Sequence, residues 1–186
     1  QEELKQHKNL KTINVYISTL GGTFMDGLPI YNELKQHPAH VTTINMGYAI
    51  SMGSVIMLAG DKIQMAQNAL IMIHSPNTFM WDQCNARDLR KTAGVLDKHE
   101  QAMLPRYRQR MNLSESEITA LLHAETWYDA EEAKTAGLID EILDPIDLDE
   151  VEEQMTEDHW RETVAQLRNQ PPANFLSRLS QHIPEA

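Results

Sequence analysis

Residues 41–60, VTTINMGYAISMGSVIMLAG, contain a strand pattern followed by a helix pattern. The β-branched residues of 41–46 predict a strand, and Gly47 predicts a tight turn after it. From Ser51 onward the small and apolar residues favour a buried helix that ends at Gly60. Ser51 therefore falls at a strand-to-helix turn, where the first N–H groups of a helix can face a ligand oxygen. Such a place suits a serine nucleophile or a serine that only caps the helix.

The stretches on either side repeat this alternation of strand and helix patterns. The order strand, helix, strand, helix implies right-handed βαβ units and a mainly parallel sheet. The sequence therefore predicts an α/β fold. Strand patterns cover 12–17, 62–65, 69–74 and 138–143, and helix patterns cover 26–37, 118–124 and 130–136.

A long helical pattern between 85 and 111 carries a narrow apolar stripe. So narrow a stripe on so long a helix suggests packing against a partner subunit, and packing within its own domain is the alternative. The residues of the stripe are Leu89, Ala93, Leu96, Met103, Tyr107 and Met111.

Composition and charge exclude several classes of protein. The formal charge of −11 argues against nucleic acid as a partner, because phosphate binding needs a basic face. No apolar run approaches the length of a membrane span. Cys84 is the single cysteine, so an internal disulfide is impossible, a zinc site has few ligands, and a reducing, cytoplasmic setting is expected.

The composition changes near residue 145. Seven acidic residues and no Lys or Arg lie between 146 and 158. We therefore expect one folded domain over 1–144 and a partly mobile acidic appendage over 145–186, which could instead be a docking tail.

Acyl transfer to a serine needs a base and a carboxylate that holds the base. His74 ends an apolar strand pattern, at the sheet edge where functional groups gather in α/β folds. Glu125, which follows a short helix, is the leading carboxylate by placement. The residues Ser51, His74 and Glu125 thus form a candidate triad. The competing carboxylates are Asp26, Asp61 and Asp129.

Two backbone N–H groups must also stabilise the oxyanion. Gly21 and Gly22 follow the strand pattern of 12–17, in a turn whose backbone can approach another group closely. The N–H groups of Gly22 and Met52 are therefore candidate donors, although an ordinary strand-to-helix connection explains the glycines equally well.

Four segments in register resemble motifs of the Clp protease proteolytic subunit family, called ClpP. Residues 50–53, ISMG, resemble its nucleophile motif ASMG, and 72–76, MIHSP, resemble its histidine motif MIHQP. Residues 19–22, TLGG, stand where the family has SPGG, and 129–133, DAEEA, resemble SAPEA. The order and gaps agree over roughly 13–143.

This resemblance implies a ClpP/crotonase-like fold assembled in stacked rings, with the long helix as a protruding handle. Ser51 would be the nucleophile and His74 the base, Glu125 would orient His74, and the N–H groups of Gly22 and Met52 would form the oxyanion hole. The family uses no metal or cofactor, and ATP, if used, would belong to a partner. The implied substrate contacts are Gly21, Ile50, Asn77 and Thr78.

Some residues depart from the family pattern. Position 125 is Glu where the family has Asp, Ile50 replaces a small residue, and the N-terminal gating segment is expected to be absent. Residues 21–39 and 85–98 are similar to stretches of the phage and prophage head maturation proteases. That branch implies cleavage of capsid or scaffold proteins. The alternatives are an ATPase-partnered subunit that degrades unfolded proteins, a crotonase-fold acyl-CoA enzyme, and an inactive shell protein.

Overall fold

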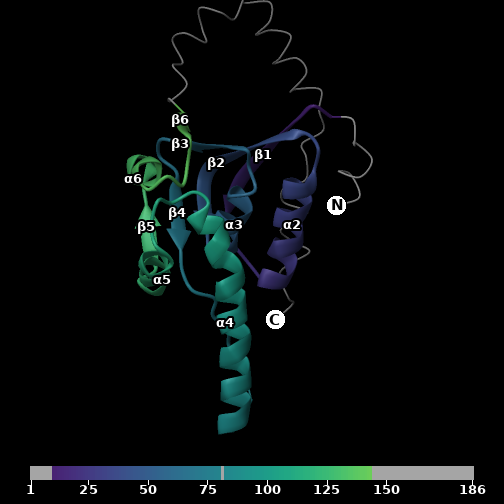
Figure 1. Cartoon of the computed structure of the whole chain (residues 1–186), viewed down its shortest axis with the longest axis vertical. Coiled ribbons are helices and arrows are strands. Elements are labelled where there is room, and N and C mark those ends of the chain that lie inside the picture. The colour runs from purple at the N-terminus through teal and green to yellow at the C-terminus, as the bar shows by residue number, and fades with distance from the viewer. Residues whose placement is uncertain (1–9, 81, 144–186) are drawn as a thin grey trace, which may run out of the picture. The chain divides into compact units, whose positions relative to one another are not determined.

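The computed structural model describes residues 10–80 and 82–143, and the predicted appendage over 145–186 lies outside them. Helices pack around a six-stranded sheet (Figure 1). The predicted α/β class is confirmed. The strands are β1 (Thr12–Thr19), β2 (His40–Ile50), β3 (Lys62–Ala66), β4 (Leu70–Ile73), β5 (Thr126–Tyr128) and β6 (Glu141–Leu143). The helices are α2 (Phe24–Gln36), α3 (Met52–Met57), α4 (Ala86–Arg108), α5 (Glu115–His123) and α6 (Ala130–Thr135).

Strand β2 is the centre of the sheet. Strand β1 pairs with it in parallel along nearly its whole length, from Thr12 opposite His40 to Thr19 opposite Ala49. The other edge of β2 is divided, because β3 pairs with residues 42–45 and β4 with residues 48–50. Both pairings are parallel, as is that of β6 with β3. The carboxyl ends of β2 and β4 therefore lie side by side.

The predicted turn at Gly47 is wrong, because β2 continues through Gly47 to Ile50. The physical reason for the glycine lies in the neighbouring strand. The pairing of β1 with β2 is irregular between Ile17 and Thr19, and a Cβ on Gly47 would lie 2.9 Å from Oγ of Ser18. Gly47 thus allows close approach of β1 instead of reversing the chain.

Strand β5 was not predicted, because three residues are too few to show an alternating pattern. It pairs antiparallel with β4, with Ile73 opposite Thr126. The other pairings of the sheet are parallel, which confirms a mainly parallel sheet. The antiparallel edge brings the segment around residue 125 beside the end of β4.

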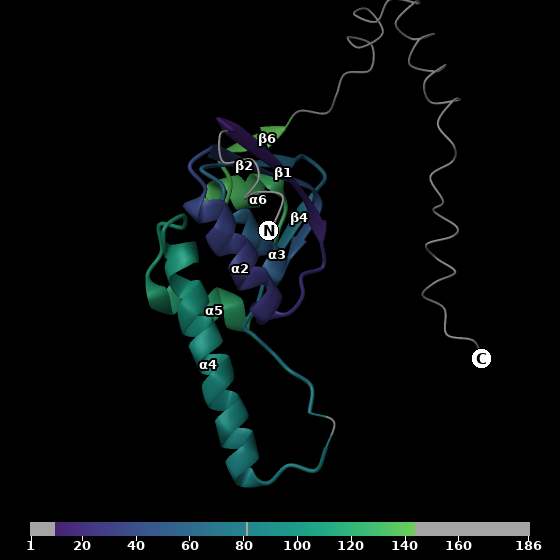
Figure 2. The same cartoon turned by 90° about the vertical axis from the view of Figure 1, so that its right-hand side faces the viewer.

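Helix α4 extends well beyond the sheet, as both views show (Figures 1 and 2). Its N-terminal half is exposed, since Leu89 of the predicted stripe keeps 51% of its surface and Val95, outside the stripe, keeps 45%. Its C-terminal part packs in the core of its own unit. The predicted apolar stripe therefore has two parts, of which one is buried within the unit and the other is uncovered. The buried side chains of α4 are Met103, Leu104 and Tyr107.

Three buried polar side chains tie neighbouring elements together. Oγ1 of Thr43 donates to the carbonyl of Met57 over 2.7 Å, and Nδ2 of Asn45 donates to the carbonyl of Leu70 over 3.0 Å. Oγ of Ser54 lies 2.6 Å from a carbonyl at the start of α3. A buried polar group without a partner is costly, so each of these bonds helps to fix α3 or β4 against β2.

Candidate active site

Ser51 lies at the sharp change of direction from β2 to α3. Its backbone has φ 56° and ψ −123°, a region that non-glycine residues rarely adopt. Its N–H donates to the carbonyl of Met72 over 2.9 Å, which continues the pairing of β2 with β4. Its side chain makes no capping hydrogen bond. The conformation resembles the strained strand-to-helix turn that exposes a nucleophilic serine.

The Ser51 side chain instead meets His74. Oγ of Ser51 lies 2.7 Å from Nε2 of His74, which directly follows β4. A neutral imidazole that carries its proton on Nδ1 can accept the serine proton at Nε2. The sequence predicted that each of these two residues stands at the end of a strand, and the structure brings them into hydrogen-bond contact.

Glu125 is placed beside His74 but is not bonded to it. Strands β4 and β5 are antiparallel, and Ile73 lies opposite Thr126. His74 directly follows β4 and Glu125 directly precedes β5, so the two residues stand side by side. Glu125 is exposed and has φ 53°, an uncommon value for a residue with a side chain. Within residues 10–80 and 82–143, no hydrogen bond or ion pair joins the two side chains. The orienting role of Glu125 therefore stays a prediction.

The three competing carboxylates are bonded elsewhere. Asp26 accepts the hydroxyl of Thr23 at 2.6 Å, and Asp129 caps α6. Asp61 lies at the opposite end of β2 from Ser51, where it accepts the N–H of Val41 at 2.9 Å. These bonds give Asp26, Asp61 and Asp129 structural roles.

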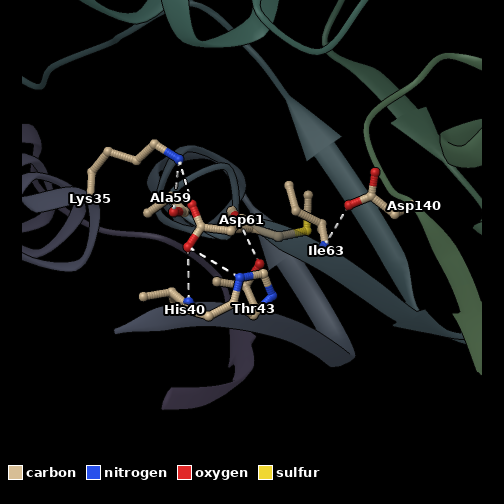
Figure 3. Close-up of polar contacts among 9 residues, drawn as sticks. Lys35, His40, Thr43, Ala59, Asp61, Ile63 and Asp140 are labelled. Carbon is tan, nitrogen blue, oxygen red and sulfur yellow. Dashed lines mark hydrogen bonds and ion pairs between the residues drawn. The ribbon is translucent and has the colours of Figure 1, made fainter. Parts of the chain in front are cut away.

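The groups around Asp61 explain why its pKa is lowered. Figure 3 shows its carboxylate between the side chains of Lys35 and His40, and Nζ of Lys35 lies 3.3 Å away. The hydrogen bond from Val41 N–H and the ammonium of Lys35 together hold the pKa of Asp61 below its ordinary value. Asp61 thus supports the start of β2.

Gly21 packs directly behind the nucleophile. A Cβ on Gly21 would lie 2.7 Å from the carbonyl oxygen of Ile50 and 2.8 Å from Cβ of Ser51. Its φ of 96° also favours glycine. Met52 is the first residue of α3, so its N–H has no acceptor within the helix. These features fit the predicted oxyanion site, in which Met52 and Gly22 would be the donors.

A cleft of about 520 Å³ opens over the Ser51 and His74 pair. Of the four predicted substrate contacts, Asn77 and Thr78 line it, whereas Gly21 lies behind the nucleophile and Ile50 is buried in the sheet. The predicted oxyanion residues also line it. The residues on the cleft wall are Gly22, Thr23, Phe24, Met25, Ser51, Met52, His74, Pro76, Asn77, Thr78, Phe79, Thr92, Val95, Leu96, His99 and Met103.

Sequence reasoning missed the wall of the cleft that α2 and α4 provide. The rings of Phe24 and His99 stack there, with centroids 4.4 Å apart and planes 13° from parallel. The apolar stripe on α4 was the available signal, because Leu96 and Met103 belong to it. The stripe by itself predicts only a packing surface, since spacing within one helix cannot show which partner the helix faces.

The described part of the chain offers no group of three or more His, Cys, Asp or Glu side chains that could hold a metal ion. None of the helices in it is both long enough and apolar enough to span a membrane.

Comparison with known proteins identifies the family. A family model described as Clp protease matches residues 3–145 of the 186. The chain belongs to the Clp protease family. It is similar to the ATP-dependent Clp protease proteolytic subunit of Deinococcus radiodurans, with 34% identity over 134 residues. Those residues are 71% of this chain and 65% of that relative, so the chain spans a little less than two thirds of the relative's length.

Membership in the Clp protease family confirms the predicted ClpP-like fold. The long exposed helix α4 and the pair of Ser51 and His74 are thus features of a Clp protease family member.

Proposed function

We propose that this chain is a serine endopeptidase of the Clp protease family, with Ser51 as nucleophile and His74 as general base. The observation that carries the proposal is the distance of 2.7 Å between Oγ of Ser51 and Nε2 of His74 at the mouth of a cleft. A nucleophile and a base within hydrogen-bond reach are the minimum for covalent catalysis by a serine.

The proposed reaction uses side-chain and backbone groups of the protein together with a water molecule. Oγ of Ser51 attacks the scissile carbonyl while His74 takes the hydroxyl proton, and His74 then gives that proton to the leaving amine. His74 then takes a proton from a water molecule that attacks the acyl-enzyme, and returns this proton to Oγ of Ser51 as the ester bond breaks. The N–H groups of Met52 and Gly22 stabilise each oxyanion, and Glu125 orients the imidazole. This scheme needs no cofactor or metal ion.

A fluorophosphonate probe tests the proposed nucleophile directly, because it reacts covalently with activated serines. We expect the wild-type protein to be labelled and Ser51→Ala to lose the label. Ser114→Ala is the control, since Ser114 is an exposed serine that caps α5, and we expect it to keep the label. Absence of labelling in the wild type would overturn the proposal and favour an inactive shell protein or a crotonase-fold acyl-CoA enzyme.

We propose that the physiological substrates are phage capsid or scaffold proteins, cleaved in the cytoplasm. The support is the similarity of 21–39 and 85–98 to head maturation proteases. The alternative is degradation of unfolded proteins with an ATPase partner, and the relative from D. radiodurans is named as ATP-dependent. Incubation with the capsid protein encoded by a neighbouring gene, with and without an ATPase, distinguishes these two functions. Cleavage at defined sites without ATP is expected, and processive loss that requires an ATPase would contradict the capsid proposal.

We further propose that copies of the chain assemble in stacked rings through α4. Leu89, on its N-terminal half, supports this proposal, because it is an exposed large apolar side chain that does not line the cleft. Sedimentation velocity on Leu89→Asp should show a smaller assembly than the wild type. Ile30→Asp, on an exposed position of α2, is the control and should keep the wild-type size. An unchanged assembly in Leu89→Asp would exclude α4 as the contact.

A further inference from the structure

Behind the nucleophile lies a pair of buried hydroxyl groups that the proposed reaction does not use. Oγ of Ser54 is 2.6 Å from the carbonyl oxygen of Ser51 and 2.7 Å from the hydroxyl of Tyr107. Ser54 and Tyr107 are both fully buried. Ser54 belongs to α3 and Tyr107 to α4, so this contact joins the long helix to the turn that carries the nucleophile.

Chemistry fixes the direction of these two hydrogen bonds. A carbonyl oxygen can only accept, so the hydroxyl of Ser54 donates its single proton to Ser51. The hydroxyl of Tyr107 must then donate to Oγ of Ser54. Burial raises the pKa of Tyr107, so its phenol keeps the proton that it donates. The result is a chain of donors that runs from Tyr107 through Ser54 to the carbonyl of Ser51.

The carbonyl of Ser51 shares a rigid peptide plane with the N–H of Met52. That carbonyl accepts the N–H of Ser54 over 3.0 Å as well as the Ser54 hydroxyl. Two donors on one carbonyl oppose rotation of the whole peptide group. The same peptide therefore has its oxygen fixed on one side and presents the candidate oxyanion donor on the other.

The strained backbone of Ser51 explains why these two hydrogen bonds to its carbonyl oxygen matter. A residue with φ 56° keeps that conformation only when the surrounding contacts impose it. Loss of one contact would let the peptide rotate, which would turn the Met52 N–H away from the cleft and shift Oγ of Ser51 relative to His74.

We propose that Tyr107 is a positioning residue of the active site, which acts through Ser54 to hold the Ser51–Met52 peptide in its oxyanion-binding orientation. The inference rests on the proposed function, because it needs Ser51 to be the nucleophile. It also means that the packing of α4 in the core affects the geometry of the nucleophile.

The test is Tyr107→Phe, which removes one hydroxyl and keeps the buried ring. We expect kcat for a fluorogenic peptide to fall about tenfold, since small misplacements of reacting groups are costly. KM should stay unchanged, because an oxyanion donor acts in the transition state and not in the bound substrate. The rate of fluorophosphonate labelling should fall by the same factor as kcat.

Thr43→Val is the matched control. It removes another buried hydroxyl, which donates over 2.7 Å to the carbonyl of Met57 at the far end of the same helix α3. We expect Thr43→Val to lower the midpoint of thermal unfolding and leave kcat unchanged. An equal loss of kcat in Thr43→Val and Tyr107→Phe would overturn the inference, because general loosening of α3 would then explain both.

The double variant Ser54→Ala with Tyr107→Phe separates stability from positioning. In Ser54→Ala alone the buried hydroxyl of Tyr107 has lost its partner, whereas the double variant lacks both hydroxyls. The double variant should therefore be more stable than Ser54→Ala. We expect its kcat to remain low, because the carbonyl of Ser51 still lacks the side-chain donor. Recovery of kcat together with stability would overturn the positioning role.

The wild-type measurements distinguish a failure of this inference from a failure of the proposed function. A wild-type protein that neither cleaves peptide nor takes the label would overturn the proposed function, and the inference with it. An active wild type with unchanged kcat in Tyr107→Phe would overturn the inference alone.

Discussion

Oγ of Ser51 and Nε2 of His74 lie 2.7 Å apart although 23 positions separate the two residues in the sequence. The sheet explains this proximity. Ile50 pairs with Met72 where β2 and β4 run in parallel, so the residues after each strand emerge at the same sheet edge. Parallel pairing and the turn at Ser51 together place nucleophile and base in contact.

His74→Ala should abolish most activity and change stability little. The imidazole is half-buried, and its hydrogen bond within the described residues is to Ser51. We expect kcat to fall by at least about a thousandfold, the order of loss for removal of a catalytic base in a serine protease. Steady-state cleavage of a fluorogenic peptide measures the loss, and a fall of less than tenfold would contradict the role of His74.

Glu125→Gln tests the third member of the proposed triad. If Glu125 orients His74, kcat should fall by about a hundredfold or more, because a neutral amide cannot stabilise the imidazolium. Glu125→Asp should retain more activity than Glu125→Gln if the carboxylate itself is needed.

Asp129→Asn is the matched control for Glu125. Asp129 accepts the N–H of Glu132 at 2.8 Å as the cap of α6. Because Asn also caps helices well, we expect a change in unfolding free energy below about 0.5 kcal/mol and unchanged kcat. A greater loss of kcat in Asp129→Asn than in Glu125→Gln would assign the orienting role to Asp129.

Gly21→Ala should damage the nucleophile turn. The new methyl group would lie 2.7 Å from the carbonyl oxygen of Ile50, at a φ of 96° that a side chain disfavours. We expect a loss of about 1–3 kcal/mol in unfolding free energy and a fall in kcat of tenfold or more. Chemical denaturation and peptide cleavage measure the two effects.

Gly94→Ala is the control for the change from glycine to alanine. Gly94 lies within α4, and a Cβ there would meet no other atom within 4 Å. Alanine in a helix interior should raise the unfolding free energy by about 0.5–1 kcal/mol. If Gly94→Ala lowered kcat as much as Gly21→Ala, close packing behind Ser51 would not be the cause.

Asp61→Asn should lower stability at neutral pH and not in strong acid. The pKa of Asp61 is lowered from 3.8 in the folded state, so the folded state binds fewer protons than the unfolded state as the pH falls. The stabilisation that the Asp61 carboxylate gives to the folded state is therefore complete above about pH 5. It is lost as the pH falls through the pKa of Asp61 in the folded state, which lies below 3.8. Because the carboxylate is 43% exposed, we expect Asp61→Asn to lower the free energy of unfolding at neutral pH by only about 1 kcal/mol.

Urea denaturation at pH 7 and at pH 3 measures this difference. The gap in unfolding free energy between wild type and Asp61→Asn should narrow at pH 3. Asp97→Asn, at an exposed position on α4, is the control and should change stability by less than about 0.5 kcal/mol at either pH. A gap for Asp61→Asn that stayed constant with pH would show that its carboxylate charge is not the stabilising feature.

The sequence predicted elements where local patterns are strong. The helix patterns over 85–111 and 118–124 correspond to α4 and α5, whose caps Asn85 and Ser114 bond to residues only three positions away. The alternation of strands and helices gave the α/β class for a similar reason. Gly47 was misinterpreted because the need for a glycine there comes from Ser18 in another strand, which no local pattern reveals.

The features of the candidate site likewise fall into those that local sequence patterns predicted and those that only the tertiary structure showed. The sequence alone determined which residues stand at strand ends and turns, and so it singled out Ser51, His74 and the glycine pair. Only the tertiary structure decided that Ser51 meets His74 and that Tyr107 supports the nucleophile turn through Ser54. Local patterns record the conformation of neighbouring residues, whereas contacts between distant residues depend on strand register and helix packing.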